Sequence, residues 1–321
     1  MTFVGIPFYT LAKYRAMGDA VPSLRKAGVV QRIKSVDNDL VDLGDVDCPS
    51  IVRDHGRKNL RNFEEFSEGT RRVKDKLTGL VDPSRITFCL GEDCAFVPGS
   101  LAGLKNVYEG KPAMVWLDAH GDFNIPETSP SGFIGGMPLA IACGRGPRLT
   151  SEIESLRPLL EEKRVVHVGS RSLDPGEDEA LLSSVKLFSA QELKKQGARE
   201  VALQISRFLN SSCDWIIAHL DVDVLDPSLM PGVDFPEPGG LARQDILQIF
   251  QALHSTGKLK VVDLTAYNPN LDKGNQGRSL LLDLAPRLAS RVQVPQPLRF
   301  SLSSFRIFSV SLSNHPPPGL W

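Results

Sequence analysis

Two acidic runs constrain this chain more than any other feature of its sequence. The first is Asp118-Ala-His-Gly-Asp122 and the second is Asp221-Val-Asp223, and each follows an apolar stretch short enough to be a buried strand. Alternate residues of an extended strand project to the same side. Asp118, His120 and Asp122 are therefore expected to point into one space, and the same holds for Asp221 and Asp223.

Carboxylates gathered in this way predict bound metal. Four of them at a strand end would repel one another strongly unless divalent cations neutralised them. Oxygen ligands with one imidazole suit Mn²⁺ or a similar ion, and carboxylates often bridge two metals. An aspartate after a strand is also a frequent turn former or helix N-cap, so one run alone would indicate capping. Two such runs favour a dinuclear metal site.

Composition limits the partners and the compartment. The 321 residues carry a formal net charge of −1, which gives no indication of nucleic acid or a membrane surface as a partner. No signal-peptide pattern and no apolar run long enough to span a bilayer is visible. The five cysteines are odd in number and lack a CxxC pair, so we expect a reduced, cytoplasmic protein. The expected partner is a small-molecule substrate. No glycine-rich phosphate loop supports a nucleotide cofactor.

Strand-like and helix-like patterns alternate along the chain. Expected strands cover 2–7, part of 35–43, 85–90, 113–117, 164–169, 185–188, 215–220 and 258–265, and expected helices cover 19–27, 62–80, 101–108, 138–143, 191–209, 243–253 and 279–289. This alternation predicts an α/β fold with a largely parallel sheet covered by helices on both faces. Ligands of such sheets bind beyond the carboxyl ends of the strands, where both acidic runs lie.

One domain is expected over residues 1–290, because no repeat or linker interrupts them. Residues 291–321 differ, since they are rich in proline and serine and their phenylalanines follow no clear period. We expect a poorly ordered tail there.

The motifs together resemble the arginase/agmatinase (ureohydrolase) family. The two acidic runs, the second continued as Asp221-Val-Asp-Val-Leu-Asp-Pro227, look like two of its signatures, and further similar segments are 5–7, 21–28, 43–45 and 168–171. The resemblance extends from the first strand to about Ala289. It implies a three-layer α/β/α fold with a parallel eight-stranded sheet, two bound Mn²⁺ ions, and a homo-oligomer of three or six chains.

The resemblance also implies which residues bind the metals. Four carboxylates and one imidazole of the family's ligand set are present, with Asp118 and Asp221 bridging the two ions; the five are Asp118, His120, Asp122, Asp221 and Asp223.

The sixth ligand departs from the family. Where the family has the histidine of a Gly-Gly-Asp-His motif, this chain reads Gly91-Glu-Asp-Cys94. A thiolate is softer than imidazole and would favour Zn²⁺ or Fe²⁺ over Mn²⁺. The alternative is that Cys94 is a small buried side chain that binds nothing.

Two further departures concern the reacting end of the substrate. Gly135 stands where arginases carry a histidine that helps move protons, and Ala266 stands where they carry a glutamate that pairs with the guanidinium. The residues that bind the amino-acid end of the substrate, which carries its α-carboxylate and α-amino groups, are retained. By resemblance Asn124 and Ser131 contact the α-carboxylate, and Asp174 helps hold the α-amino group.

The family mechanism implies that a metal-bound hydroxide attacks the carbon of an amidine or guanidine group and splits a C–N bond, with Asp122 as the catalytic residue that passes a proton to the leaving amine. The first hypothesis is such a hydrolase acting on an arginine-like amino acid whose distal group is a modified guanidine, a formimino group or similar. The missing glutamate at Ala266 suits a group less cationic than guanidinium, such as an N-hydroxyguanidine. Some ureohydrolase-like enzymes of biosynthetic pathways also carry a cysteine at the metal site.

Two other hypotheses stay open. An ordinary arginase or agmatinase would have to tolerate Gly135 and Ala266, which argue against it. A catalytically weak homologue would keep the fold as a metal-binding or regulatory subunit of a mixed oligomer. Of the remaining histidines only His219, two residues before Asp221, could approach the site, and we expect it to pack or to support the ligands.

Overall fold

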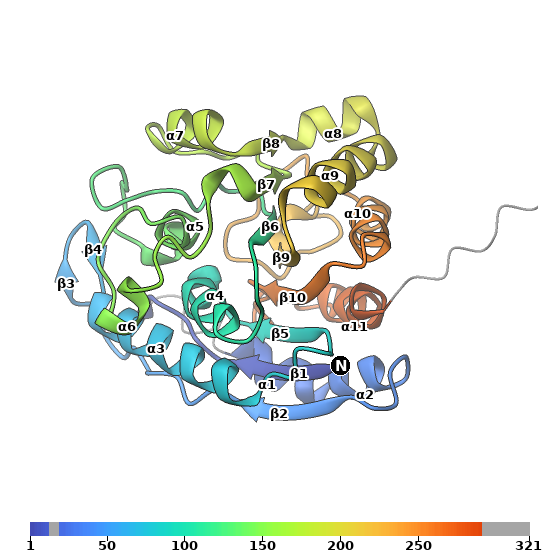
Figure 1. Ribbon diagram of the computed structural model, residues 1–321, viewed down its shortest axis with the longest axis horizontal. Coiled ribbons are helices and arrows are strands. Elements are labelled where there is room, and N and C mark those ends of the chain that lie inside the picture. The colour runs from blue at the N-terminus through green and yellow to red at the C-terminus, as the bar shows by residue number, and fades with distance from the viewer. Residues whose placement is uncertain (13–18, 291–321) are drawn as a thin grey trace, which may run out of the picture.

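The computed structural model describes residues 1–12 and 19–290, which form a central sheet between two layers of helices (Figure 1). Eight strands pair in the order β2-β1-β5-β10-β9-β6-β7-β8, and every pairing is parallel. The strands are β1 (Thr2–Ile6), β2 (Val41–Asp45), β5 (Thr87–Gly91), β6 (Pro112–Leu117), β7 (Val165–Val168), β8 (Lys186–Phe188), β9 (Trp215–Asp221) and β10 (Leu259–Thr265).

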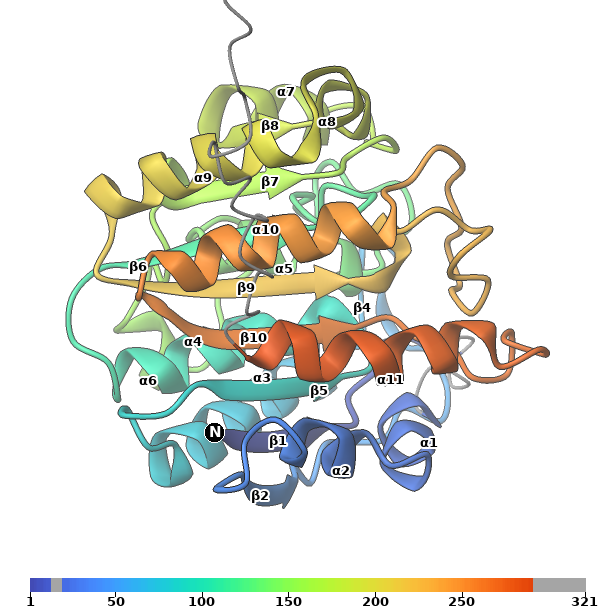
Figure 2. The same cartoon turned by 90° about the vertical axis from the view of Figure 1, so that its right-hand side faces the viewer.

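The helices divide between the two faces of the sheet. One face is covered by α3 (Phe63–Leu80), α4 (Val97–Lys105) and α5 (Pro138–Ala142), with α6 (Ser151–Glu154) and α7 (Glu177–Ser184) at its margin. The other face, turned toward the viewer in Figure 2, carries α1 (Ala20–Lys26), α2 (Val29–Lys34), α8 (Ala190–Gln196), α9 (Ala198–Ser212), α10 (Arg243–Ser255) and α11 (Gln276–Ala289). The expected three-layer α/β/α fold with an eight-stranded parallel sheet is confirmed.

Burial on both faces explains the sequence of the central strands. Every residue of β5, β6 and β9 is buried, and a strand covered on both sides reads as a continuous apolar run rather than an alternating one. Because β5, β10, β9 and β6 are neighbours and parallel, their carboxyl ends lie at one edge of the sheet. The segments that follow these four strands are therefore brought together at that edge.

Several element boundaries differ from the sequence-based expectation. The strand expected within 35–43 is β2, which begins only at Val41 because turns at residues 35–39 follow the unexpected helix α2. The helical stretch 191–209 is two helices, since Gly197 between them has a positive φ of 86°. The helix expected over 101–108 is α4, which begins at Val97 with a proline in its first turn.

Short elements were missed because their patterns are weak. The helix α7 has only Leu181 as a fully buried apolar residue, so its sequence shows no amphipathic stripe. The hairpin β3 (Gly56–Arg57) with β4 (Leu60–Arg61) is too short for a strand pattern to appear. The expected tail over 291–321 lies outside the described residues. Within the described residues, no helix combines the length and the apolarity that crossing a membrane requires.

Candidate metal centre and substrate pocket

The first acidic run follows β6 but is not a strand. Asp118 Oδ1 accepts a hydrogen bond of 2.7 Å from the backbone N–H of His120, and its Oδ2 accepts one of 3.0 Å from the indole N–H of Trp116. Asp122 has a φ of 49°, in the left-handed region. The three side chains do converge as expected, but a tight backbone turn brings them together rather than the alternation of an extended strand.

The second run caps β9 in a similar way. Asp221 is the last residue of the strand, and its Oδ1 accepts a 2.8 Å hydrogen bond from the N–H of Asp223, which lies in one 3-10 turn. Asp223 Oδ1 in turn accepts a 3.2 Å bond from the N–H of Ala119 in the first run. Asp118 and Asp221 are thus fixed within their own runs, and the bond from Ala119 to Asp223 joins the two runs.

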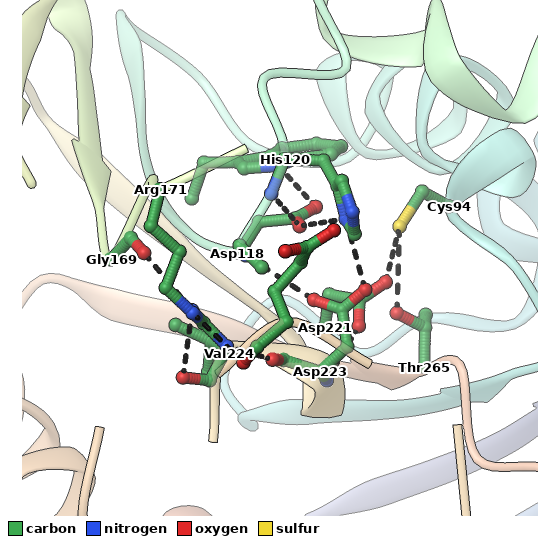
Figure 3. Close-up of polar contacts among 12 residues, drawn as sticks. Cys94, Asp118, His120, Gly169, Arg171, Asp221, Asp223, Val224 and Thr265 are labelled. Atoms are coloured by element: carbon green, nitrogen blue, oxygen red, sulfur yellow. Dashed lines mark hydrogen bonds and ion pairs between the residues drawn. The ribbon is translucent and has the colours of Figure 1, made fainter. Parts of the chain in front are cut away.

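Two groups of possible metal ligands result, and they share Asp118. One consists of Cys94, Asp118 and Asp122, the other of Asp118, His120 and Asp223, and in each group the ligand atoms lie within 4.8 Å of one another. The remaining predicted ligand, Asp221, lies beside the first group, where its Oδ2 accepts a 3.2 Å hydrogen bond from the Cys94 thiol (Figure 3). The structure therefore brings all six predicted ligands together.

The electrostatics of this cluster suit divalent cations. Burial raises the pKa of Asp118, Asp122 and Asp221, and the neighbouring carboxylates raise it further.

His120 is the cation nearest to the cluster. Its burial alone would lower its pKa, but its contacts with Asp118 and Asp223, the latter 3.0 Å from Nδ1, outweigh burial and raise that pKa to about 12. Burial likewise opposes ionisation of Asp223, yet the bond from His120 leaves its pKa below the usual value. One imidazolium cannot neutralise four carboxylates, and cations at the two ligand groups would do so.

The turn that carries Cys94 is anchored by its two acidic residues. The buried carboxylate of Glu92 accepts hydrogen bonds of 3.0 Å from the backbone N–H groups of Ala20 and Val21. Asp93 accepts bonds of 2.9 and 2.8 Å from the N–H and hydroxyl of Thr10. These carboxylates are committed to holding the turn in place. Burial raises the pKa of the Cys94 thiol well above its usual value, and a bound metal would reverse that shift.

The ligand groups form the base of a cavity of about 340 Å³. At its other end the Nδ2 of Asn124 donates a 2.9 Å hydrogen bond to Asp174 Oδ2, and Ser131 lines the opening, where its hydroxyl accepts a bond from the Phe133 N–H. The three predicted substrate-binding residues thus line one end of the same cavity. Nine of the described lining residues are acidic and none is lysine or arginine; the acidic ones are Asp93, Asp118, Asp122, Asp174, Glu177, Asp221, Asp223, Asp234 and Glu237.

Glu177 is a structural member of this site that the sequence analysis did not identify. Its carboxylate accepts hydrogen bonds of 2.7 Å from the N–H of Phe123 and 3.1 Å from the N–H of Asp174. A Cβ at Gly121 would come within 2.5 Å of the Glu177 carboxyl carbon, so the glycine of the first acidic run makes room for it. Glu177 therefore ties the metal end of the pocket to the amino-acid end.

An aromatic wall on one side of the pocket was also missed. The rings of Phe133 and Phe235 stack with centroids 6.0 Å apart, and Phe235 meets the His120 ring edge-on at 5.9 Å. A Cβ at Gly135 would lie 2.2 Å from Phe133 Cζ, so the Phe133 ring occupies the space that a side chain at 135 would need. Ala266 also lines the cavity, and its φ of 68° is unusual for a residue other than glycine. Both rings belong to irregular segments, where hydrophobic periodicity gives no signal.

Arg171 holds the loop after β9 in place. Its guanidinium donates to backbone carbonyls on both sides of the site, among them those of Gly169 at 3.1 Å and Asp223 at 2.7 Å (Figure 3). Its segment was noted for its resemblance, but a half-buried arginine bound to backbone carbonyls leaves no mark in a single sequence.

Comparison with known proteins agrees with this geometry. The family model described as Arginase family matches residues 1–289. This chain belongs to the arginase family. The arginase of Bacillus caldovelox is 33% identical over 288 residues, which is 88% of this chain and 96% of that protein.

Solved structures give the same result. The structure of the B. caldovelox arginase has a TM-score of 0.84 at 30% identity and covers 92% of this chain and 98% of that one. An Entamoeba histolytica arginase solved in complex with L-ornithine has a TM-score of 0.81 at 28% identity, with 90% and 98% covered. The chain is accordingly a hydrolase that acts on C–N bonds of linear amidines.

Proposed function

We propose that this arginase-family chain is a dinuclear metal hydrolase that splits a C–N bond in the amidine or guanidine group of an arginine-like amino acid. The observation that carries the proposal is the sharing of Asp118 between two ligand groups at the base of the pocket. A carboxylate common to two such groups is what a pair of bridged cations requires. When bound, the two cations lower the pKa of a shared water, supply the nucleophile, and offset negative charge on the substrate.

The ions proposed are two Mn²⁺, with Zn²⁺ or Fe²⁺ favoured at the position that Cys94 reaches. Oxygen ligands with one imidazole suit Mn²⁺, whereas a thiolate is a softer donor. The Cys94 sulfur lies in the same group as Asp118 and Asp122, which supports its role as a ligand over the alternative of a side chain that only packs.

The amino-acid end of the pocket supports an amino-acid substrate. Asp174 presents a carboxylate beside Asn124 there, where it suits an α-ammonium group, while the amide of Asn124 and the hydroxyl of Ser131 suit the α-carboxylate. The related arginase solved with L-ornithine also binds an amino acid.

The reacting end supports a distal group that is less cationic than guanidinium. A guanidinium normally pairs with a carboxylate through two parallel hydrogen bonds, and Ala266 cannot provide one. The rings of Phe133 and Phe235 offer an apolar, planar surface instead. An N-hydroxyguanidine is planar and less basic than a guanidine, so it carries less positive charge at neutral pH and loses less on leaving water.

Asp122 is the proposed proton carrier. It is buried, its pKa is raised well above the usual value, and it stands in the ligand group of Cys94 and Asp118. A carboxyl group of that kind can take a proton from the attacking water and return it to the leaving amine nitrogen. With Gly135 at the position of the family's histidine, bulk solvent would exchange the proton directly with Asp122.

A second candidate is a catalytically weak homologue that serves as a metal-binding or regulatory subunit. The replacements Gly135 and Ala266 favour it, because both remove side chains that act on the substrate. For the hydrolase we propose a cytoplasmic homo-oligomer of three or six chains. The second candidate would be a subunit of a mixed oligomer in the same compartment. All five cysteines are free, which suits a reducing compartment.

Metal content and turnover together test the proposal. The purified protein is loaded with Mn²⁺ or Zn²⁺, its bound metal is counted, and it is assayed with arginine, N-hydroxyarginine, agmatine and a formimino amino acid. We expect two ions per chain and release of hydroxyurea, urea or formamide from one amino-acid substrate. If the protein binds at most one ion per chain and turns over none of these substrates, the proposed dinuclear hydrolase is overturned. The metal-binding or regulatory subunit is then the proposal that stands.

Restoring the missing carboxylate tests the specificity argument. Ala266→Glu should raise the ratio of kcat/KM for arginine over N-hydroxyarginine by about tenfold or more, since a charge-assisted hydrogen bond contributes roughly 1.5–3 kcal/mol. Ala266→Gln is the matched control, because it adds the same bulk at the same positive φ without the charge. Equal ratios in the two variants would count against a guanidinium-selective role for this position.

A further inference from the structure

A buried polar row crosses the sheet beneath the metal ligands. His219 on β9 is in register with Trp116 on β6 and with Asp263 on β10, which is in turn in register with Cys89 on β5. Residues in register on neighbouring parallel strands face the same side of a sheet. All four side chains have a relative exposure of 0%.

The two ring nitrogens of His219 face different groups, and only Nε2 is within hydrogen-bonding distance; among the described residues Nδ1 has no hydrogen-bond partner. Its Nε2 lies 3.2 Å from Cys94 Sγ, and its Nδ1 lies 3.7 Å from Asp263 Oδ2. The ring stacks on Trp116, with centroids 3.9 Å apart, and it meets Phe96 at 6.3 Å. The aromatic neighbours restrict rotation of the imidazole, so its two nitrogens keep these directions.

Asp263 has no direct route to the substrate pocket. It is outside both ligand groups and does not line the cavity. Within the described residues, neither of its carboxylate oxygens has a hydrogen-bond partner. Burying a carboxylate without a partner is unfavourable by several kcal/mol, and the imidazole of His219 is the basic group in contact with it.

His167 shows what a buried histidine looks like without such contacts. It lies on β7, which pairs with the edge of β6 that is turned away from β9, and it is in register with Trp116. It is as fully buried as His219. Neither of its ring nitrogens meets a hydrogen-bond partner among the described residues, and burial lowers its pKa to about 4. Among the described residues no hydrogen-bonded partner orients the His167 ring, although Asp118 and His120 are among its neighbours. His219 differs by its contacts with a thiol and a carboxylate.

We propose that His219 and Asp263 are positioning residues for the Cys94 sulfur. Asp263 sets the direction of the His219 ring, and the ring holds Cys94 Sγ toward Asp118 and Asp122, so that the sulfur serves as a metal ligand. The inference rests on the proposed dinuclear function. It explains how a cysteine, which is shorter than the histidine it replaces, is kept on the metal side of its turn.

Cobalt provides a readout that does not depend on turnover. The protein is loaded with Co²⁺, and thiolate ligation is followed by the charge-transfer absorption of the Co–S bond in the near ultraviolet, with binding measured by calorimetry. We expect the absorption in the wild type and its loss in Cys94→Ser. His219→Asn, which keeps an amide near the Nδ1 position but nothing at Nε2, should weaken the absorption and lower affinity for one ion by about 10- to 100-fold.

Matched variants separate positioning from packing. His219→Gln places an amide near the Nε2 position and should restore most of the absorption, while Asp263→Asn should give an intermediate loss. His167→Asn makes the same replacement at an equally buried site and should leave the absorption unchanged. Thermal unfolding of each variant shows that it is folded. An equal loss of absorption in His167→Asn would overturn the proposal.

A double-mutant cycle gives the sharpest test. If His219 acts through the sulfur, His219→Asn should have no further effect on Co²⁺ affinity in a Cys94→Ser background. A full effect in that background overturns the inference. Two bound Co²⁺ ions without a thiolate absorption in the wild type also overturn it, while the proposed dinuclear hydrolase stands. A wild type that binds no metal overturns both.

Discussion

The two sides of the pocket are built on different principles. On the side of β6 and β9, two carboxylates are fixed by hydrogen bonds within their own short runs: the N–H of His120 binds Asp118, and that of Asp223 binds Asp221. On the side of β5 and β10, Cys94 is held by residues more than a hundred positions away, including His219 and Thr265. The first side matches the family's ligand pattern and the second departs from it. A ligand set encoded locally is retained as a unit, whereas a side assembled over long range can exchange one donor for another.

The largest expected effect comes from the β6 and β9 side. Asp118→Asn removes the carboxylate common to both ligand groups, so metal affinity should fall by roughly 100-fold or more, beyond the 10- to 100-fold typical of residues that only support ligands. Bound metal is measured by mass spectrometry and calorimetry. The metal-free variant should unfold at an equal or higher temperature than the metal-free wild type, because repulsion among the carboxylates is relieved. Asp234→Asn, in the same pocket but outside both groups, is the control, and retained affinity in Asp118→Asn would refute the shared-ligand arrangement.

The amino-acid end should show a smaller effect that is confined to binding. Asp174→Asn removes the charge proposed to meet the α-ammonium, so KM should rise by about 10- to 100-fold with a smaller change in kcat. Steady-state kinetics on the wild type and the variant measure it. A substrate analogue that lacks the α-amino group is the control and should not distinguish the two proteins. An equal penalty on that analogue would show that Asp174 supports the fold of the pocket instead.

The β5 side can be tested by restoring the family's donor. Cys94→His should raise Mn²⁺ affinity about tenfold relative to Zn²⁺, because imidazole is harder than thiolate. Competition between the two metals, followed by calorimetry, reports the change. Cys213→Ala removes another buried thiol, outside the ligand groups, and should leave the preference as it is. An unchanged preference in Cys94→His would mean that the sulfur is not a ligand.

The smallest expected effect concerns how the stability of the folded protein changes with pH, which should differ between the metal-free and the metal-loaded protein. Burial raises the pKa of Asp93 from its ordinary 3.8 to about 6, so the folded state keeps a proton that the unfolded chain loses. The metal-free protein should therefore lose stability as pH rises from about 4 to 6. The raised pKa values of Asp118 and Asp122 act in the same direction, and the lowered pKa of Asp223 opposes them.

Metal binding should reverse this trend, because the ligands must give up their protons to bind. Unfolding temperatures at pH 5 and pH 8 test it, and the rise on adding Mn²⁺ or Zn²⁺ should be larger at pH 8. A rise that is larger at pH 5 would contradict the assignment of these buried carboxyls as ligands. Calcium added at the same concentration controls for nonspecific ionic effects.

Much of the site could be predicted because its signals are local. The runs from Asp118 to Asp122 and from Asp221 to Asp223 each contain their ligands within a few residues, and each follows a strand that reads as apolar from end to end. The geometric reason for their convergence was different from the one expected, since Asp122 lies in a left-handed turn and not in a strand. The residue types were nevertheless sufficient, because carboxylates at such density require a cation in any backbone conformation.

The sequence by itself determined the family, the alternation that forms the parallel sheet, and five of the six candidate ligands, since each depends on residues close together in the chain. Tertiary structure alone decided what stands around Cys94: the pairing of β9 with β10 that sets His219 against Asp263, and the placing of the Phe133 and Phe235 rings over the pocket. The physical reason is that these contacts depend on strand order and register. Those are fixed by the packing of the whole sheet, and no local pattern encodes them.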